Sequence, residues 1–366
     1  MRKPRVLFVG RTRYRLPLSP SLAQKFDALG TELDVHVLAS AAPGSGLGDR
    51  AFTLVRPFRL PGLDGVAFWL SLPSRIVRLL RELRPDAVVC QTAYDAAAAL
   101  LARRIARVPA RVVVEVHGDW RTSTRLYGSP ARRVFGRLGD VVAAAALRRA
   151  DAVRTVSPFT AGLVRELGVE PRAGFPAFMD LEPFVGPAAP LPPEPVALFI
   201  GVLEAYKNID GLARAWQLAA PRIPGASLHL VGNGTRTDVA EGLVREHGAR
   251  WERELSPVEV AAALDAAWLL VLPSRSEGMG RVLVEAFCRG RAVVGTRAGS
   301  IPDLVADGVS GLLVEPDEPA ALADALVRVL SDRALAWRLG TGAQAAAEPW
   351  LQTPAEYARR MRELVE

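Results

Sequence analysis

Short apolar, β-branched runs alternate with longer helical stretches along this chain, and that alternation limits its fold more than any other feature. Each run is typical of a buried strand, and each Ala-, Leu- and Arg-rich stretch is long enough for a helix that returns to the next strand. The runs occupy residues 5–10, 33–39, 86–91, 111–117, 151–157, 196–201, 227–232, 268–274, 292–296 and 311–315. We therefore expect an α/β protein with doubly wound parallel sheets.

A proline-rich segment divides the runs into two sets. Residues 183–195, "PFVGPAAPLPPEP", contain six prolines, which cannot continue a helix or a central strand and form a stiff spacer. A chain of 366 residues also exceeds what one hydrophobic core usually supports. We expect an N-terminal domain over 1–182, a linker over 183–195, a C-terminal domain over 196–350 and a terminal helix over 351–366.

Charge is distributed unevenly between the two halves. Residues 1–185 contain 28 Lys/Arg and 16 Asp/Glu (+12), whereas residues 186–366 contain 18 and 23 (−5). A basic field of this kind attracts nucleic acid, an anionic membrane surface or a phosphorylated substrate, and charge alone does not choose among them.

The cysteines and the first residues of the chain indicate the cellular compartment in which we expect the protein. Cys90 and Cys288 are the only cysteines and lie far apart in sequence, so we expect neither a disulfide framework nor a Cys-based zinc site. The apolar run after "MRKP" is too short for a signal peptide, and no other run approaches the length of a membrane span. These features favour a reducing cytoplasm.

The common nucleotide-binding motifs are missing. The first strand leads into "GRTRYRLPLSP", which lacks the G-x-G-x-x-G spacing, and Gly232 and Gly234 form only a G-x-G. The sequence also lacks the Walker pattern and any D-x-D pair that would hold a metal and a sugar nucleotide. We therefore expect any nucleotide chemistry to work without a metal.

One stretch, "PSRSEGMGRVLVEAF" at 273–287, combines two carboxylates with a glycine pair at the start of a helix. Unpaired backbone N–H groups at that helix start suit a phosphate, and glycine permits close approach. Glu285 in the helix can accept two hydroxyl hydrogen bonds, as a ribose diol requires, and Glu277 faces what lies beyond the phosphate. This arrangement suits a sugar nucleotide. Taken singly, Glu277 is better explained as a solvated loop residue, and Glu285 as an acidic residue that favours the first turns of a helix.

The same stretch resembles the Glu, seven residues, Glu signature of retaining glycosyltransferases of family 4. The similarity includes "GVLEAYKNIDGLARAW" (201–216), "VSPFTAGLVRELG" with "PAFMD", and "TRAGSIPDLVADGVSGLLVEPDEPAALADAL" (296–326). It is good from about residue 86 to the end and poor before that. The resemblance implies the GT-B fold, in which two Rossmann-like domains face a cleft.

The resemblance also implies roles for individual residues. Glu277 would hold sugar hydroxyls near the anomeric carbon, Lys207 would neutralise the leaving diphosphate, and His117 would face the donor sugar. Glu285 would bind the donor ribose. The further donor-binding positions are Gly278, Met279, Gly280, Arg281, Val282, Arg253 and Gly10. From the residues alone, Lys207 is equally an exposed lysine and His117 a structural histidine at a strand end.

The acceptor region is less defined. A stretch at 56–84 combines aromatic residues with arginines at helical spacing, and basic residues also follow the first strand. Together they fit an anionic headgroup or a lipid phosphate. The candidate acceptor or membrane residues are Asp119, Arg11, Arg13, Trp69, Arg75 and Arg78. The alternative is a helix that packs its apolar side on the sheet with solvated arginines outside, and Asp119 as a solvated loop residue.

The expected function is retaining transfer from a nucleotide-diphosphate sugar to a glycan, glycolipid or polysaccharide, with no cofactor, metal or nucleic acid. We expect it in the cytoplasm or at the inner face of the cell membrane. The family often has arginine where this chain has Val202. Two alternatives therefore stay open: a transferase-like binding protein with impaired turnover, and another GT-B enzyme such as a nucleotide-sugar epimerase.

Overall fold

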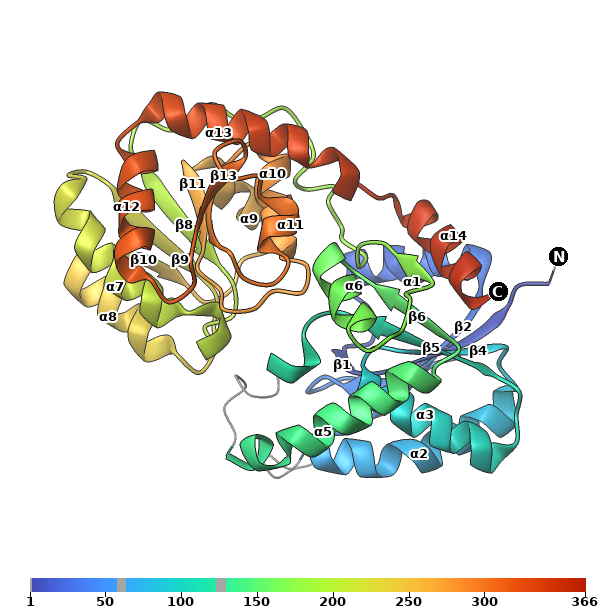
Figure 1. Ribbon diagram of the computed structural model, residues 1–366. Coiled ribbons are helices and arrows are strands. Elements are labelled where there is room, and N and C mark those ends of the chain that lie inside the picture. The colour runs from blue at the N-terminus through green and yellow to red at the C-terminus, as the bar shows by residue number, and fades with distance from the viewer. Residues whose placement is uncertain (1, 58–63, 123–129) are drawn as a thin grey trace. The chain divides into compact units, whose positions relative to one another are not determined.

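The computed structural model describes residues 2–57, 64–122 and 130–366, which form two compact units (Figure 1). The first unit holds the described residues up to 120 together with 134–178 and 352–366. The second holds 179–351 and the described residues between 121 and 133. Each unit is an α/β structure around its own parallel sheet.

The first unit contains a seven-stranded sheet in the order β3-β2-β1-β4-β5-β6-β7. Its strands are β1 (Arg5–Tyr14), β2 (Asp34–Ala41), β3 (Phe52–Val55), β4 (Ala87–Cys90), β5 (Arg111–Val116), β6 (Ala152–Thr155) and β7 (Ala173–Gly174). The helices of this part of the chain are α1 (Pro20–Glu32), α2 (Asp64–Leu83), α3 (Ala93–Ala106), α5 (Pro130–Arg149), α6 (Pro158–Arg165) and α14 (Pro354–Val365). All its strand pairs are parallel, and the order reverses direction between β1 and β4.

Alternate residues of its strands supply two separate cores. Leu7 and Val9 of β1 face a cluster with α2 and α3, whereas Val6 and Phe8 face a cluster with α1 and α14. Figure 1 shows α1 and α14 on one face of this sheet and α2, α3 and α5 on the other. Because side chains alternate across a strand, a strand buried on both faces is apolar along its whole length.

The second unit repeats this plan with six strands in the order β10-β9-β8-β11-β12-β13. They are β8 (Val196–Ile200), β9 (Ser227–Val231), β10 (Arg250–Glu252), β11 (Leu269–Leu272), β12 (Ala292–Thr296) and β13 (Gly311–Val314). The helices are α7 (Ile209–Ala219), α8 (Thr237–His247), α9 (Pro257–Asp265), α10 (Arg281–Cys288), α11 (Ile301–Leu304), α12 (Pro319–Leu330) and α13 (Arg333–Ala346). The expectation of two doubly wound parallel sheets is confirmed. The central strands β8 and β11 mark the reversal, where ligands of open α/β sheets bind at the carboxyl ends.

All ten predicted runs contain strands, and the sequence missed β3, β7 and β10. These three are short, and each is an edge strand that pairs on one side only. In β3, buried and half-buried residues alternate, and β10 contains Arg250 and Glu252. An edge strand needs fewer apolar residues, so it leaves a weaker signal in the sequence.

The proline-rich segment is attached to the second unit through its backbone. The indole nitrogen of Trp268 donates to the Pro192 carbonyl at 2.9 Å, and the Arg333 guanidinium donates to the same oxygen at 2.6 Å. Leu191 is buried in the core of that unit. Proline has no N–H to satisfy, so side-chain donors that reach its carbonyls fix such a segment without regular secondary structure.

The C-terminal helix α14 packs on α1 and completes a core of the first unit. Tyr357, Met361 and Leu364 are all buried there. The Tyr357 ring packs edge-on against Phe175 and Phe178, with centroids 6.1 and 5.6 Å apart. The last residues of the chain therefore contribute to the stability of the unit that begins it.

We expect Tyr357→Ala to destabilise the first unit by about 3–5 kcal/mol, because it leaves a cavity among packed rings. Tyr357→Phe keeps those ring contacts and should cost much less. Urea unfolding followed by tryptophan fluorescence measures both variants. Equal, small effects of the two substitutions would mean that α14 does not pack on this core.

Candidate functional site

A buried ion pair lies at the carboxyl ends of β8 and β11. Lys207 ends a short 3₁₀ turn (Ala205–Lys207) after β8, and Glu277 lies in the loop after β11. The Lys207 Nζ is 2.5 Å from Glu277 Oε1, and the Ser274 hydroxyl donates to the same oxygen at 2.8 Å. Both charged residues are only 9% exposed. Lys207 is therefore not an exposed lysine, and Glu277 is not a solvated loop residue.

The loop that carries Glu277 is held in place by its backbone. The Arg275 N–H donates to the Tyr206 carbonyl at 2.7 Å, which joins the loop to the turn that bears Lys207. The Ser300 N–H donates to the Glu277 carbonyl at 3.0 Å. Gly299 (φ +57°) lies so close that a Cβ there would be 2.2 Å from this carbonyl oxygen. Desolvation makes a buried pair costly, so a pair held this firmly at a sheet's ligand-binding edge is a candidate for function.

The start of α10 adds a second feature to the same edge. Gly280 caps the helix in the left-handed region (φ +56°), and the exposed Arg281 follows it. Met279 and Val282 are buried, so they support the turn rather than present side chains. Glu285 is half-buried, and its burial raises the pKa of its carboxyl, with the charge of Arg281 opposing this. The first amides of α10 remain suited to an anion.

The close contact between the loops after β8 and β9 accounts for the two glycines of the G-x-G motif, Gly232 and Gly234. A Cβ on Gly232 would be 1.8 Å from the Gly201 carbonyl oxygen, and one on Gly234 would be 2.5 Å from that of Leu203. These glycines therefore serve the packing of two loops against each other. Val202, in the same region, is 46% exposed and apolar. Arg253 is exposed, and its guanidinium lies over the Trp251 ring at 4.7 Å.

In the first unit, His117 follows β5 directly and is backed by buried charges. Its side chain is 41% exposed, and its Nε2 is 3.5 Å from Glu115 Oε2. Glu115 is buried and pairs with Arg154, which is fully buried on β6. Arg154 also donates to the Phe175 carbonyl at 3.1 Å and stacks on the Phe175 ring. Burial alone would raise the pKa of Glu115, but Arg154, with His117, outweighs burial and holds this pKa well below its usual range.

Sequence reasoning missed Glu115 and Arg154, although a signal for them exists. Each is a charged residue inside an otherwise apolar strand, "RVVVEV" and "AVRT". The parallel register pairs the two positions directly, Glu115 with Arg154. Opposite charges at interior positions of neighbouring strands indicate an internal ion pair, because an unpaired buried charge is far more costly.

The remaining predicted residues of the first unit are distributed among several elements. A Cβ on Gly10 in β1 would be 2.0 Å from Gln91 Oε1, so this glycine admits a neighbouring side chain. The Trp69 indole donates to Asp95 at 3.1 Å, and burial raises the pKa of that carboxyl to about 6. Arg75 and Arg78 are exposed on α2, and Arg78 pairs with Glu82 at 2.8 Å. Arg11 and Asp119 are half-buried, and Arg13 is exposed.

The described part of the chain contains no group of three or more His, Cys, Asp and Glu residues that could hold a metal ion. Among the helices described, none is both long enough and apolar enough to cross a membrane.

Two protein-family models match the chain. The model described as "Glycosyl transferases group 1" matches residues 194–332, which lie in the second unit. The model described as "Glycosyl transferase 4-like domain" matches residues 19–173. The second match begins well before residue 86, so the likeness reaches further into the first half than the sequence motifs indicated.

Curated relatives match parts of the chain. The D-inositol 3-phosphate glycosyltransferase of Corynebacterium glutamicum is 33% identical over 173 residues, which is 44% of this chain and 41% of the relative. The protein of that name from Corynebacterium aurimucosum is 37% identical over 147 residues, 37% of this chain and 35% of the relative. The matched regions thus span less than half the length of these relatives.

Two solved structures match nearly the whole chain. The sucrose-phosphate synthase of Thermosynechococcus elongatus has a TM-score of 0.79 and 21% identity, and the match covers 99% of this chain and 98% of that one. The Anabaena protein HepE, solved with UDP and glucose, has a TM-score of 0.72 and 19% identity, with 98% of both chains covered. At these identities the likeness establishes the fold, which is GT-B.

We expect Glu115→Gln to destabilise the protein by about 3 kcal/mol or more, because it leaves the buried Arg154 charge without its carboxylate. Since folding lowers the pKa of Glu115, its stabilising contribution is fully present above the ordinary value of 4.5 and is lost as the pH falls through the lowered pKa. Unfolding of both proteins between neutral and acid pH checks this. A variant as stable as the wild type would contradict the described pair.

Proposed function

Because the chain belongs to the group 1 glycosyl transferases, we propose that it is a retaining glycosyltransferase. It would move a sugar from a nucleotide-diphosphate sugar to a glycan, glycolipid or polysaccharide acceptor, without a metal. The observation that carries this proposal is the buried Lys207–Glu277 pair beside the start of α10. A cation, the start of a helix and a carboxylate further along that helix match the diphosphate and ribose of such a donor.

The names of similar proteins support the donor class. Curated relatives are named D-inositol 3-phosphate glycosyltransferases, and the HepE protein was solved with UDP-glucose. A UDP-sugar is therefore the first donor to test on this chain. The acceptor is proposed only as a class, because the relatives match less than half of their own length.

In the proposed reaction, charge stabilisation replaces general-base chemistry by a carboxylate. The acceptor oxygen bonds to the anomeric carbon on the face from which the diphosphate leaves, and the acceptor proton passes to a diphosphate oxygen. Lys207 neutralises charge on the leaving group, and Glu277 holds both Lys207 and the sugar hydroxyls in place. Glu285 accepts the ribose hydroxyls as a carboxylate. His117, oriented by Glu115, is the candidate in the first unit for a contact to the transferred sugar.

A second candidate function follows from Val202. This exposed apolar side chain cannot supply the second cation that the family often places there, so less positive charge is available to the leaving diphosphate. A nucleotide-sugar-binding protein with impaired turnover is consistent with that substitution. Such a protein would bind the nucleotide but not hydrolyse or transfer the sugar.

The two glutamates should respond differently to substitution. Glu277→Gln should lower turnover by roughly 100-fold or more with little change in nucleotide affinity, because it removes a charge near the reacting carbon. Glu285→Gln should weaken nucleotide binding by roughly tenfold, because the ribose loses a charged acceptor. Hydrolysis of UDP-, GDP- and ADP-glucose measures turnover, and calorimetric titration with the nucleoside diphosphate measures affinity.

Glu241→Gln, an exposed glutamate on α8, is the matched control and should leave both quantities unchanged. Equal effects of the two site variants would show that the roles are assigned wrongly. Tight nucleotide binding by the wild type without hydrolysis of any donor would favour the binding-protein alternative.

A further inference from the structure

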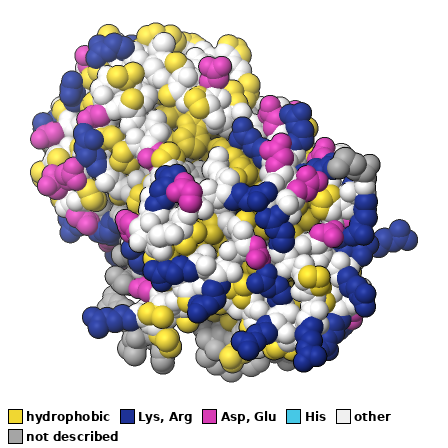
Figure 2. Space-filling view, turned by 45° about the vertical axis from the view of Figure 1, so that its right-hand side comes forward, with side chains coloured by type: hydrophobic (Ala, Val, Ile, Leu, Met, Phe, Trp, Pro, Cys, Tyr) yellow, Lys and Arg dark blue, Asp and Glu magenta, His cyan; other side chains and the backbone are white. Residues whose placement is uncertain are grey.

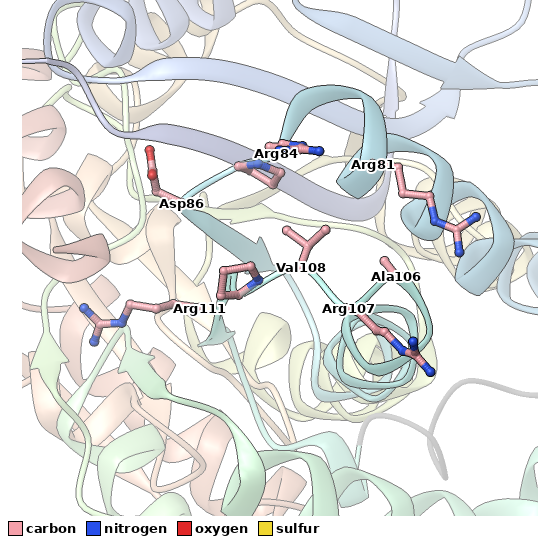
Figure 3. Close-up of a pocket in the computed structure, with 9 residues that line it drawn as sticks. Arg81, Arg84, Asp86, Ala106, Arg107, Val108 and Arg111 are labelled. Atoms are coloured by element: carbon pink, nitrogen blue, oxygen red, sulfur yellow. The ribbon is translucent and has the colours of Figure 1, made fainter.

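A pocket of about 610 Å³ lies at the edge of the first unit opposite His117, where β4 and β5 begin. Its walls are the end of α2, the end of α3 and the segment that leads into β5. Four arginines line it: Arg81, Arg84, Arg107 and Arg111. Figure 3 shows Arg81 and Arg107 on one side of Val108 and Arg111 on the other. The volume lies in the range of small-molecule sites, about 300–1,000 Å³.

Three of these cations have no anionic partner within the described residues. Arg111 reaches the C-terminal Glu366, and the one lining carboxylate, Asp86, is paired with Arg2 at 3.1 Å. By contrast, Arg81, Arg84 and Arg107 are exposed and have neither an ion pair nor a side-chain hydrogen bond in the described part of the chain. Many Lys and Arg side chains lie along the lower part of the face shown in Figure 2.

The backbone at two of these arginines is in an uncommon conformation. Arg84 (φ +45°) and Arg107 (φ +56°) follow the ends of α2 and α3 in the left-handed region, where glycine is the usual residue. The other described non-glycine residues with positive φ are Asn208 and Asp317, whose side chains favour this region. Two arginines in this conformation on one pocket indicate that their side chains serve that pocket.

Helix dipoles do not cancel this charge. Basic residues are common at helix C-termini because the carbonyl end carries about −0.5 of a charge, and the ends of α2 and α3 together contribute about −1. Against this stand the three unpaired guanidinium groups of Arg81, Arg84 and Arg107. The pocket therefore keeps a net positive charge of about 2, enough to favour an anion of charge −2.

We propose that this pocket binds a phosphate-bearing ligand, either a soluble phosphate compound or the headgroup of an anionic lipid. Planar guanidinium groups match phosphate oxygens in pairs, which a single point charge does not. The pocket begins where β5 begins, at Arg111, and His117 follows the other end of that strand. At about 3.3 Å per residue the two lie about 20 Å apart, so the ligand would not touch His117.

The test compares wild type with the double variant Arg84→Gly and Arg107→Gly. Glycine suits both backbone conformations, so this variant should unfold no earlier than the wild type. The control is Arg104→Gln with Arg172→Gln, which removes the same charge from two exposed arginines of the same unit that do not line the pocket. One arm titrates inorganic pyrophosphate by calorimetry. The other measures cosedimentation with vesicles of phosphatidylcholine and phosphatidylglycerol in equal amounts.

We expect binding to weaken roughly tenfold or more in the glycine variant and to stay unchanged in the control. Loss in the pyrophosphate arm identifies a soluble ligand, and loss in the vesicle arm alone identifies a lipid headgroup. Any pyrophosphate that binds at the Lys207 site adds the same binding signal in all three proteins, because that site lies in the other unit and none of the substitutions alters it. Absence of binding in both arms, or equal binding by the glycine variant and wild type, would overturn the proposal.

Discussion

The buried ion pair of Lys207 and Glu277 is the interaction on which the proposed chemistry of this protein depends. It joins the turn after β8 to the loop after β11, the two central strands of the second unit. A buried pair adds little net stability, because the cost of removing two charges from water offsets most of their attraction. What it fixes is position. The lysine is held where a diphosphate would be neutralised, and the glutamate where sugar hydroxyls would be bound.

In the first unit, the charged residues at the carboxyl ends of the strands differ in burial and pairing from those at the amino ends. At the carboxyl ends, His117 is backed by the Glu115–Arg154 pair, whose two charges are internal and compensate each other. At the amino ends, the arginines that follow α2 and α3 are exposed and have no ion pair within the described residues. Part of the basic excess seen in the first half of the sequence therefore gathers around this pocket, while other exposed arginines of the unit, such as Arg104 and Arg172, lie outside it.

The sequence predicted the fold well because strands buried on both faces are apolar along their whole length. Each of the ten runs that it indicated contains a strand, from β1 to β13. It could not predict β3, β7 and β10, since short strands at a sheet margin need few apolar residues. It also proposed a proline-rich spacer, whereas the structure shows residues such as Leu191 and Pro192 bound to the second unit by side chains distant in sequence.

For the candidate site, local motifs were informative and long-range pairs were not. The spacing of Glu277 and Glu285 within one loop and helix could be read directly. That Lys207 contacts Glu277 across 70 residues could not, because it depends on the order of strands in the sheet. The roles of Arg11, Arg13, Trp69, Arg75, Arg78 and Asp119 toward an acceptor stay predictions. The arginine pocket was missed because its residues come from the ends of two helices that meet only in the folded unit.

Thermal unfolding with UDP, GDP, ADP, CMP and buffer alone tests the central claim most directly. A nucleotide at about a hundred times its dissociation constant should add roughly 2.7 kcal/mol to the free energy of unfolding, which is visible as a melting shift. We predict that one nucleoside diphosphate stabilises the wild type, and the identity of that nucleotide gives the base of the donor. We also predict that Lys207→Met reduces this melting shift. No shift with any nucleotide would contradict a donor site around Lys207, Glu277 and Glu285.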